Sequence, residues 1–203
     1  MSLASYSDLQ TAVANWTHRA DLTSVIPDLI TLAETKLLRD LRTREMETAF
    51  SLTMAADGTL AIWSNYIDLK EAYISASPIR FLERKSPRWI RERYQSASVV
   101  STPRFIAREG SSFIFGPYPD SQYTVNGIFY KNRGPLSTNT THTIFTTNPD
   151  VYLFGTLLEC VPYLKDEKRI PIWEQKYQSS LEHANRKSAR EEYSGSDLRM
   201  VSA

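Results

Sequence analysis

The chain has 203 residues, of which 41% are hydrophobic and 23% are charged, and its formal net charge is +1. This length and composition predict one globular domain that can bury a core. The balanced charge argues against a dedicated DNA-binding domain, which usually carries a basic excess on one face, although a local basic patch remains compatible with it.

The cysteine content and the N-terminus bear on the cellular compartment. Cys160 is the single cysteine and lies in an apolar run, so a disulfide framework within one chain is impossible. We therefore expect an intracellular, reducing origin and a buried, structural thiol. The first ten residues lack the features of a signal peptide, and no apolar run approaches the roughly 18 residues of a membrane span. The sequence predicts no membrane partner.

Two helices are predicted near the N-terminus, within residues 7–45. Ser7 is the expected N-cap of the first helix, with Gln10 three residues later as in a capping box. Pro27 is expected to open the second helix, because proline is tolerated in the first turn. The apolar residues of both segments recur at helical spacing. We expect the two helices to form a short antiparallel pair.

From about residue 48 to 147 the pattern indicates a β-rich insertion. Asp57-Gly58 signals a hairpin. The stretch YIDLKEAYISAS is ambiguous, although its Tyr and Leu spacing suits a helix. Short helices are expected to begin at Pro78 and Pro87. Residues 104–133 contain three alternating apolar runs separated by turns, which predicts an antiparallel meander with one buried face.

The last third returns to helices, within residues 149–193. Asn148-Pro149 begins one helix and Pro171 opens the next, which predicts a second helical hairpin. The expected fold class is α+β: a helical bundle of N- and C-terminal helices, with an inserted small antiparallel β-sheet. Residues 1–193 are predicted to form this single domain, and residues 194–203 an extended C-terminal arm.

The C-terminal arm has two interpretations. It is either a frayed terminus or a segment that becomes ordered on a partner. Leu198 and Met200 are apolar residues on a segment too short to bury them alone, and Arg199 is placed to pair with an acidic group. Together with Tyr193 at the base of the arm, they are the candidate partner-binding residues.

Motifs that carry chemistry are missing from the sequence. It has no glycine-rich nucleotide-binding loop and no nucleophile elbow. His18, His142 and His183 are not at metal-binding spacings, and one cysteine cannot form a cysteine-rich zinc site. We therefore predict no enzymatic activity, no cofactor and no metal. A hydrolase with carboxylate chemistry is a weak alternative, motivated only by scattered Asp and Glu residues.

One segment is strongly basic. The segment from Arg80 to Arg93 contains six basic residues and two acidic ones, with Trp89 inside it and Tyr94 directly after it. The basic residues are Arg80, Arg84, Lys85, Arg88, Arg91 and Arg93. One interpretation is a patch that faces nucleic acid or an acidic protein surface. The other is a solvated helix face whose arginine stems cover Trp89.

The expected strands also carry many aromatic residues. Alternate residues should pack the core, and the others should face outward, where they mark a candidate protein–protein surface. The outward candidates are Phe115, Tyr118, Tyr123 and Tyr130.

A family resemblance extends over most of the chain and lies in three stretches. These are SYSDLQTAVANWTHRADLTSVIPDLITLAETKLLRDLRTREME, PRFIAREGSSFIFGPYPDSQYTVNGIFYKNRGPLS and EEYSGSDLRM. The first resembles the N-terminus of tailed-bacteriophage head–tail adaptor proteins of the SU10-like group. The second is similar to the sheet of that group, and the third to its flexible C-terminal arm.

This resemblance implies a structural role. Members of the group form a ring, generally twelvefold, beneath the portal protein, extend the DNA channel and present a platform for tail or nozzle proteins. The helical part would form the ring body, the arm would dock on the portal, and genomic DNA would pass through the lumen without sequence readout. The expected location is the head–tail junction of the virion, after assembly in the host bacterial cytoplasm. The alternative function is a nucleic-acid-binding module that uses Arg80–Arg93.

Overall fold

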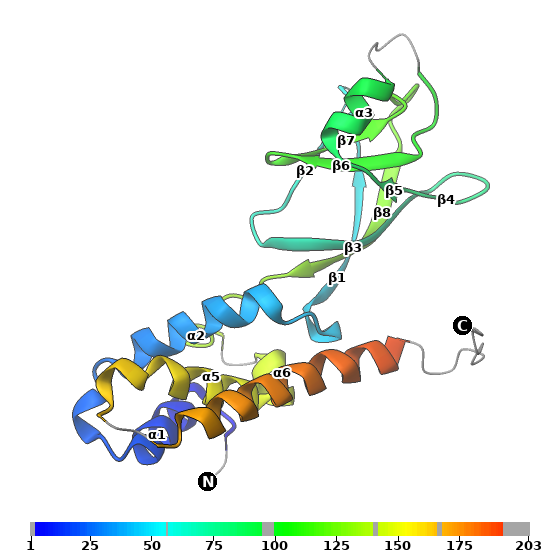
Figure 1. Ribbon diagram of the computed structural model, residues 1–203. Helices are drawn as coiled ribbons and strands as arrows, with labels where there is room; N and C mark the ends of the chain where they lie inside the picture. Colours follow the sequence, from blue (N-terminus) through cyan, green and yellow to red (C-terminus); the bar gives the residue numbers. More distant parts are fainter. Residues whose placement is uncertain (1–2, 56, 95–99, 140–141, 166–167, 193–203) are drawn as a thin grey trace. The chain divides into compact units, whose positions relative to one another are not determined.

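The computed structural model contains two compact units, one helical and one rich in β-strands (Figure 1). The helical unit comprises residues 1–46 and 133–203, and the β unit comprises residues 47–132. The predicted α+β class is confirmed. That the units fold as one cooperative domain stays a prediction. The structure describes residues 3–55, 57–94, 100–139, 142–165 and 168–192.

The helical unit is organised around α5. Its elements are α1 (Tyr6–Thr17), η1 (Ala20–Leu22), α2 (Ile26–Asp40), η2 (Arg44–Met46), α4 (Thr143–Thr147), α5 (Pro149–Glu159), η3 (Val161–Tyr163) and α6 (Ile170–Glu192). Helix α5 contacts α1, α2, α4 and α6, and every residue from Val151 to Leu157 is buried. A helix that is apolar on all sides is expected in such a central position. Gly155 permits the close approach of α6, because a Cβ there would lie 3.2 Å from Cε2 of Tyr177.

The helix starts agree largely with the sequence. Pro27, Pro149 and Pro171 lie in the first turns of α2, α5 and α6, as predicted. The N-cap of α1 is Ser5 instead of Ser7, because Ser5 Oγ accepts a hydrogen bond from Asp8 N (3.2 Å) while Asp8 Oδ2 accepts one from Ser5 N (3.0 Å). Helices α1 and α2 pack more extensively on α5 than on each other, so the expected α1–α2 pair is a minor contact.

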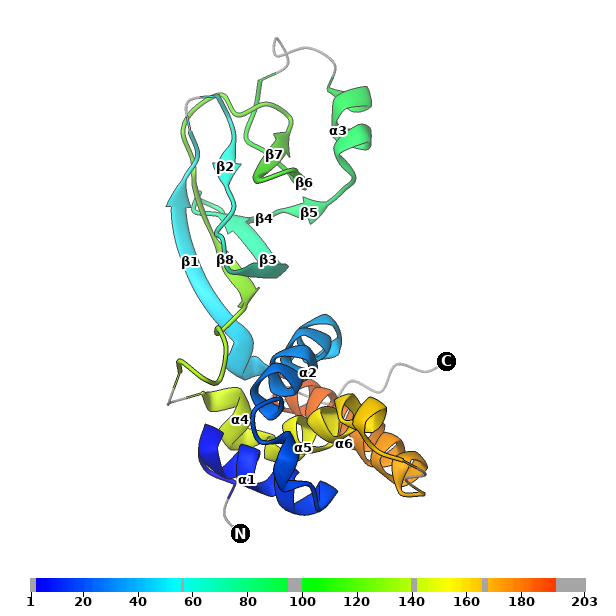
Figure 2. The same cartoon turned by 90° about the vertical axis from the view of Figure 1, so that its left-hand side faces the viewer.

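The β unit consists of two four-stranded sheets, in the orders β1-β8-β3-β4 and β2-β7-β6-β5 (Figure 2). The strands are β1 (Glu47–Thr53), β2 (Leu60–Ala61), β3 (Tyr66–Ile74), β4 (Arg80–Phe81), β5 (Glu83–Arg84), β6 (Phe105–Glu109), β7 (Ser112–Gly116) and β8 (Thr124–Lys131). A short helix, α3 (Pro87–Arg93), follows β5. Apolar side chains of both sheets form one core, in which Leu69 and Phe129 of the first sheet join Ile106 and Phe113 of the second.

The strand pairing differs from the predicted single antiparallel sheet. Strands β6 and β7 form the expected hairpin, but β8 pairs with β1 and β3 in the other sheet, so the predicted three-strand meander is wrong. The expected hairpin around Asp57-Gly58 is also wrong, because β1 and β2 lie in different sheets. The β5–β6 pair is parallel. Alternation marks a strand but not its partner, and these partners are distant in sequence.

Some secondary-structure expectations are corrected as well. The YIDLKEAYISAS stretch contains β3, in which irregular pairing with β8 interrupts the alternation, so buried Leu69 and Ala72 are three residues apart as in a helix. Pro78 precedes β4 and opens no helix, whereas Pro87 opens α3 as predicted. Residues 143–147, expected in the β-rich segment, form α4.

Candidate interaction surfaces

The basic residues between Arg80 and Arg93 are mostly paired within the β unit. They belong to β4, β5 and α3, with Lys85 between the last two. Four of them contact carboxylates, in the pairs Arg84–Asp68 (3.5 Å), Lys85–Glu83, Arg88–Glu92 (2.6 Å) and Arg91–Glu109 (2.5 Å). Arg80 donates to the Thr102 carbonyl at 3.4 Å. Among the residues that the structure describes, only Arg80 and Arg93 of this set lack a carboxylate partner.

This pairing reduces the basic excess that the sequence suggested. The field that would attract a phosphate backbone is weakened wherever a carboxylate lies within an ion pair of the cation. Trp89 is covered by Lys85, whose Nζ lies 5.4 Å from the ring centroid, and it also meets Phe105 edge to face at 4.8 Å. These contacts favour a solvated face over a nucleic-acid patch.

The four aromatic interface candidates have different surroundings. Phe115 is only 3% exposed and packs in the core of the β unit, on the same face of β7 as Phe113. It is therefore not a surface residue of this unit, and its assignment to the outer face was wrong. Tyr118, Tyr123 and Tyr130 are half-buried. The Tyr123 hydroxyl donates to Asp120 Oδ1 at 2.6 Å, and its ring packs against the core.

Sequence reasoning missed the most exposed aromatic residue of the β unit. Phe81 is 66% exposed and Ile79 is 61% exposed, and we call these two residues the β4 patch. Phe81 lies opposite Tyr73 across β3 and β4, with the ring centroids 5.6 Å apart. The available signal was the Ile-Arg-Phe alternation after Pro78, which places both apolar residues on one side of a short edge strand.

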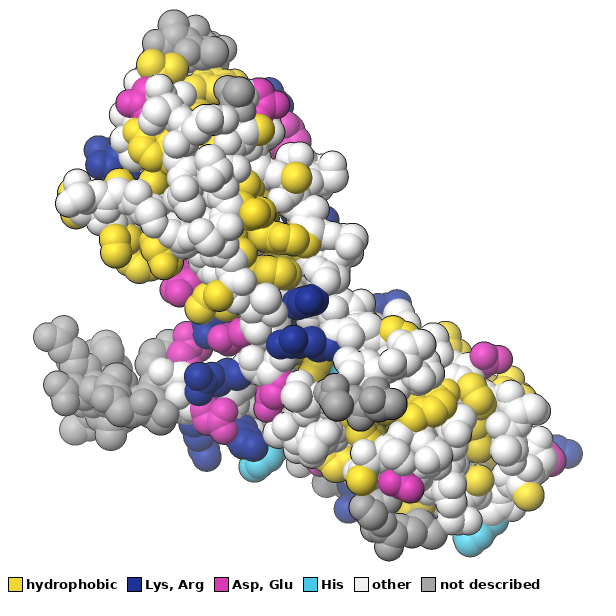
Figure 3. Space-filling view, turned by 180° about the vertical axis from the view of Figure 1, so that it is seen from behind, with side chains coloured by type: hydrophobic (Ala, Val, Ile, Leu, Met, Phe, Trp, Pro, Cys, Tyr) yellow, Lys and Arg dark blue, Asp and Glu magenta, His cyan; other side chains and the backbone are white. Residues whose placement is uncertain are grey.

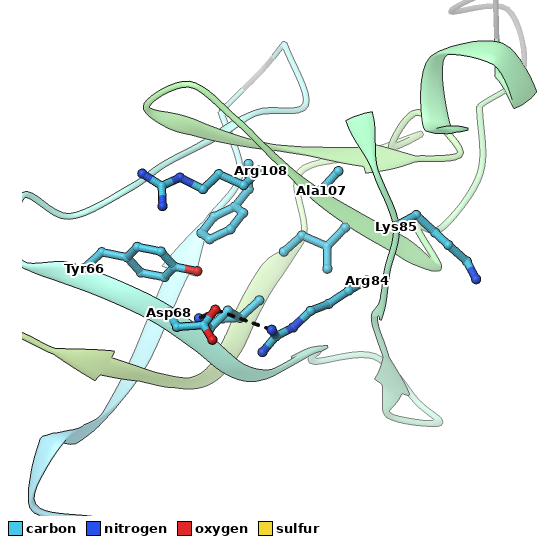
Figure 4. A pocket seen from close by; sticks show the side chains of 9 residues that line it. Tyr66, Asp68, Arg84, Lys85, Ala107 and Arg108 are labelled. Atoms are coloured by element: carbon cyan, nitrogen blue, oxygen red, sulfur yellow. Dashed lines mark hydrogen bonds and ion pairs between the residues drawn. The ribbon is translucent and has the colours of Figure 1, made fainter. Parts of the chain in front are cut away.

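A cavity of about 220 Å³ opens between the two sheets of the β unit, and we call it the β-unit cavity (Figure 4). Its apolar wall includes Leu69, Ile106 and Phe113, all of which are buried. Arg84 and Arg108 lie on different sides of it. The Arg108 guanidinium lies 5.2 Å from the centre of the Tyr66 ring, and burial is the main cause that raises the pKa of Tyr66. The cavity therefore combines an apolar interior with a cationic margin.

The helical unit also exposes large apolar side chains. Trp16, Leu32, Tyr163 and Ile172 lie at its surface, and Figure 3 shows hydrophobic side chains on the surfaces of both units. Trp16 is partly fixed, because its ring meets Phe154 edge to face at 5.8 Å. Exposed apolar residues on both units are what a protein that assembles with others requires.

Two buried groups of the helical unit are structural in their surroundings. Cys160 is fully buried, and burial raises the pKa of its thiol to about 11. Burial also lowers the pKa of His142, whose Nε2 lies 3.2 Å from the Gly134 carbonyl and whose Nδ1 lies 3.4 Å from the Tyr152 hydroxyl. One neutral tautomer satisfies both contacts, with Nε2–H donating and Nδ1 accepting.

Within the described ranges, no group of three His, Cys, Asp or Glu residues is placed to hold a metal ion. None of the helices described is long and apolar enough to cross a membrane. The predicted arm residues Tyr193, Leu198, Arg199 and Met200 lie outside the described residues.

The comparison with protein families identifies the class. The SU10 adaptor protein family matches residues 4–200, which is nearly the whole chain. The chain therefore belongs to the SU10 adaptor protein family, as the resemblance predicted, and is a structural adaptor of a bacteriophage. No curated protein matches the chain.

Proposed function

We propose that this chain is a head-to-tail adaptor that forms a homo-oligomeric ring under the portal protein, twelvefold as is general in the group it resembles. The ring would extend the DNA channel and provide the attachment platform for tail or nozzle proteins at the head–tail junction of the virion. The observation that carries the proposal is the family match over residues 4–200.

The surfaces of both units support this role. A ring in which each subunit contacts two neighbours uses two different lateral surfaces, so each subunit needs apolar surface beyond its own core. The β4 patch and the exposed residues of the helical unit supply such surface. A formal net charge of +1 is compatible with a channel wall along which DNA slides without tight binding.

Cryo-electron microscopy of purified phage particles tests the proposal. The expected result is a ring of this chain between the portal and the tail, with density for the C-terminal arm against the portal. The chain's absence from purified particles, or its location away from the portal vertex, would overturn the proposal.

The second candidate is a nucleic-acid-binding module, and one observation favours it: Arg80 and Arg93 lack carboxylate partners among the described residues. The test is a gel-shift assay with duplex DNA at low salt. Binding that weakens steeply as salt increases would support this function, and no shift at low salt would eliminate it.

A further inference from the structure

The β4 patch and the β-unit cavity are complementary in size and chemistry. We propose that Phe81 of one copy of this chain inserts into the β-unit cavity of the next copy, and that this contact joins neighbouring subunits head to tail. The inference rests on the proposed ring and names one of its subunit contacts.

The cavity is large enough for a phenyl ring. Its volume is about 220 Å³, and an apolar cavity of about 150 Å³ already holds benzene in another protein. Leu69, Ile106 and Phe113 supply apolar atoms around the inserted ring. Phe81, 66% exposed in a single copy, would be removed from water by this contact.

The margin of the cavity favours an aromatic occupant. Guanidinium groups stack on aromatic faces, and Arg84 and Arg108 lie on different sides of the cavity (Figure 4). Arg108 already makes such a contact with Tyr66, at 5.2 Å from the ring centre. Arg80, next to Phe81 in the inserting strand, would approach Asp68. The present partner of Asp68 is Arg84 at 3.5 Å, a half-exposed pair that can exchange.

One copy cannot fill its own cavity in this way. Phe81 pairs with Tyr73 toward the end of β3, whereas Tyr66, Asp68 and Leu69 line the cavity at the start of that strand. At about 3.3 Å per residue, Leu69 and Tyr73 are about 13 Å apart. The inserting residue and the cavity are therefore different surfaces of the same unit. A contact of this kind is heterologous and repeats from copy to copy until a ring closes.

The test is a disulfide trap in assembled particles. Phage carrying the double variant Ile79→Cys/Arg108→Cys are purified, oxidised mildly and analysed on a non-reducing gel. Both positions are exposed, and the native Cys160 is buried and does not compete. Because each copy would be linked to two neighbours, the expected result is a ladder of covalent multimers of this chain.

Three controls identify the contact. Neither single-cysteine variant should give a ladder. Leu52→Cys/Arg108→Cys should give none either, because Leu52 is exposed on β1, away from the β4 patch. Adding Phe81→Asp to the double variant should reduce the linked fraction at least tenfold.

The outcomes separate this contact from the proposed function. Particles that contain the chain but give no ladder, or dimers only, overturn the Phe81 contact and leave the ring intact. Particles that lack the chain overturn the proposed function, and the contact with it.

Discussion

The Arg91 guanidinium donates two hydrogen bonds to the Glu109 carboxylate, from Nε to Oε1 at 2.9 Å and from Nη2 to Oε2 at 2.5 Å. This bidentate pair joins α3 to the end of β6 within the β unit. It holds α3 against its sheet. It also neutralises the charge of Arg91, one of the basic residues that the sequence offered as a nucleic-acid patch.

The first prediction concerns the titration of Glu109. The hydrogen bond from Arg91 is the main cause that holds the pKa of the Glu109 carboxyl below its ordinary value of 4.5. Because the pKa is lowered in the folded state, the stabilisation is present above pH 4.5 and is lost as the pH falls through the folded-state pKa. In an NMR titration, the substitution Arg91→Gln should return the pKa of Glu109 toward 4.5. Arg88→Gln, which removes a pair within α3, should leave Glu109 unchanged. An unaltered Glu109 titration in Arg91→Gln would contradict this account.

The second prediction concerns DNA. If the second candidate function holds, we expect binding to duplex DNA only at low salt and without sequence preference, since most cations of the basic segment are paired. Arg80→Ala and Arg93→Ala should each reduce the salt-dependence slope by about 1. Arg186→Ala, in a helical-unit pair with Glu182, is the matched control and should not change it. Tight binding that persists at high salt would refute this expectation.

The third prediction concerns Gly127 in β8. A Cβ at this position would lie 2.2 Å from the Glu71 carbonyl oxygen and 2.9 Å from the Ala72 Cα, so β3 would have to move. We expect Gly127→Ala to lower the free energy of unfolding of the β unit by about 1–3 kcal/mol, the range for overpacking. Urea unfolding followed by tryptophan fluorescence measures this change.

Gly110→Asn is the control for Gly127→Ala. Gly110 has a φ of +59° in the β6–β7 turn with no atom within 4 Å of an added Cβ, and asparagine tolerates this backbone. Its expected cost is below about 1 kcal/mol. Equal unfolding midpoints for the two variants would show that the β3–β8 approach is not tight.

The fourth prediction concerns the acid side of the stability curve. Burial lowers the pKa of His142 from its ordinary 6.5, so the folded state binds a proton less readily than the unfolded state. The contribution of His142 to the free energy of unfolding is then fully present above pH 6.5. It is lost as the pH decreases from 6.5 through the folded-state pKa. The nearby Arg133 adds to this effect.

A half-buried group of the helical unit contributes to the pH dependence of stability with the opposite sign. Burial raises the pKa of Glu34, whose carboxylate accepts a hydrogen bond from Leu136 N at 2.7 Å. Its contribution is present below its ordinary pKa of 4.5 and is lost as the pH rises through the folded-state value. The two groups are separated by comparing thermal midpoints at pH 7.5 and 5.5 for the wild type and His142→Asn. The loss on acidification should be smaller in His142→Asn, and an equal loss would exclude His142 as its cause.

The fifth prediction concerns the C-terminal arm. Deleting the residues after Tyr193 should leave the thermal midpoint unchanged and abolish docking on the portal, if Leu198 and Met200 provide the contact. Co-sedimentation with purified portal protein measures docking. The double variant Leu198→Ser/Met200→Ser in the full-length chain should reproduce the loss. Equal docking by the truncated protein would refute the arm hypothesis.

Local signals in the sequence proved more informative than long-range ones. Pro27, Pro87, Pro149 and Pro171 mark helix starts because a proline costs little in a first turn, whatever the rest of the fold. The partner of β8 had no such signal. It pairs with β1, whose register joins Glu47 to Tyr130, and nothing local to either strand specifies a partner at that distance in sequence.

The candidate surfaces follow the same rule. Pairs close in sequence, such as Arg88–Glu92, are readable from helical spacing, whereas Arg91–Glu109 depends on a fold that brings α3 to β6. Phe115 was assigned to the outer face because the sequence predicted a single sheet. The second sheet, which the sequence did not reveal, completes the core in which Phe115 is buried. Phe81 was overlooked because β4 is only two residues long.

The path of the chain between the units has an evolutionary consequence. The chain leaves the helical unit after residue 46 and re-enters it at Arg133. Arg133 donates to the Glu45 carbonyl through Nε (2.9 Å) and Nη2 (2.6 Å), so hydrogen bonds within the helical unit join the exit and re-entry segments. Any insert whose own ends lie side by side, as those of β1 and β8 do, meets the same requirement. We therefore expect the helical framework to keep its packing if the inserted unit is replaced by another unit whose ends lie side by side.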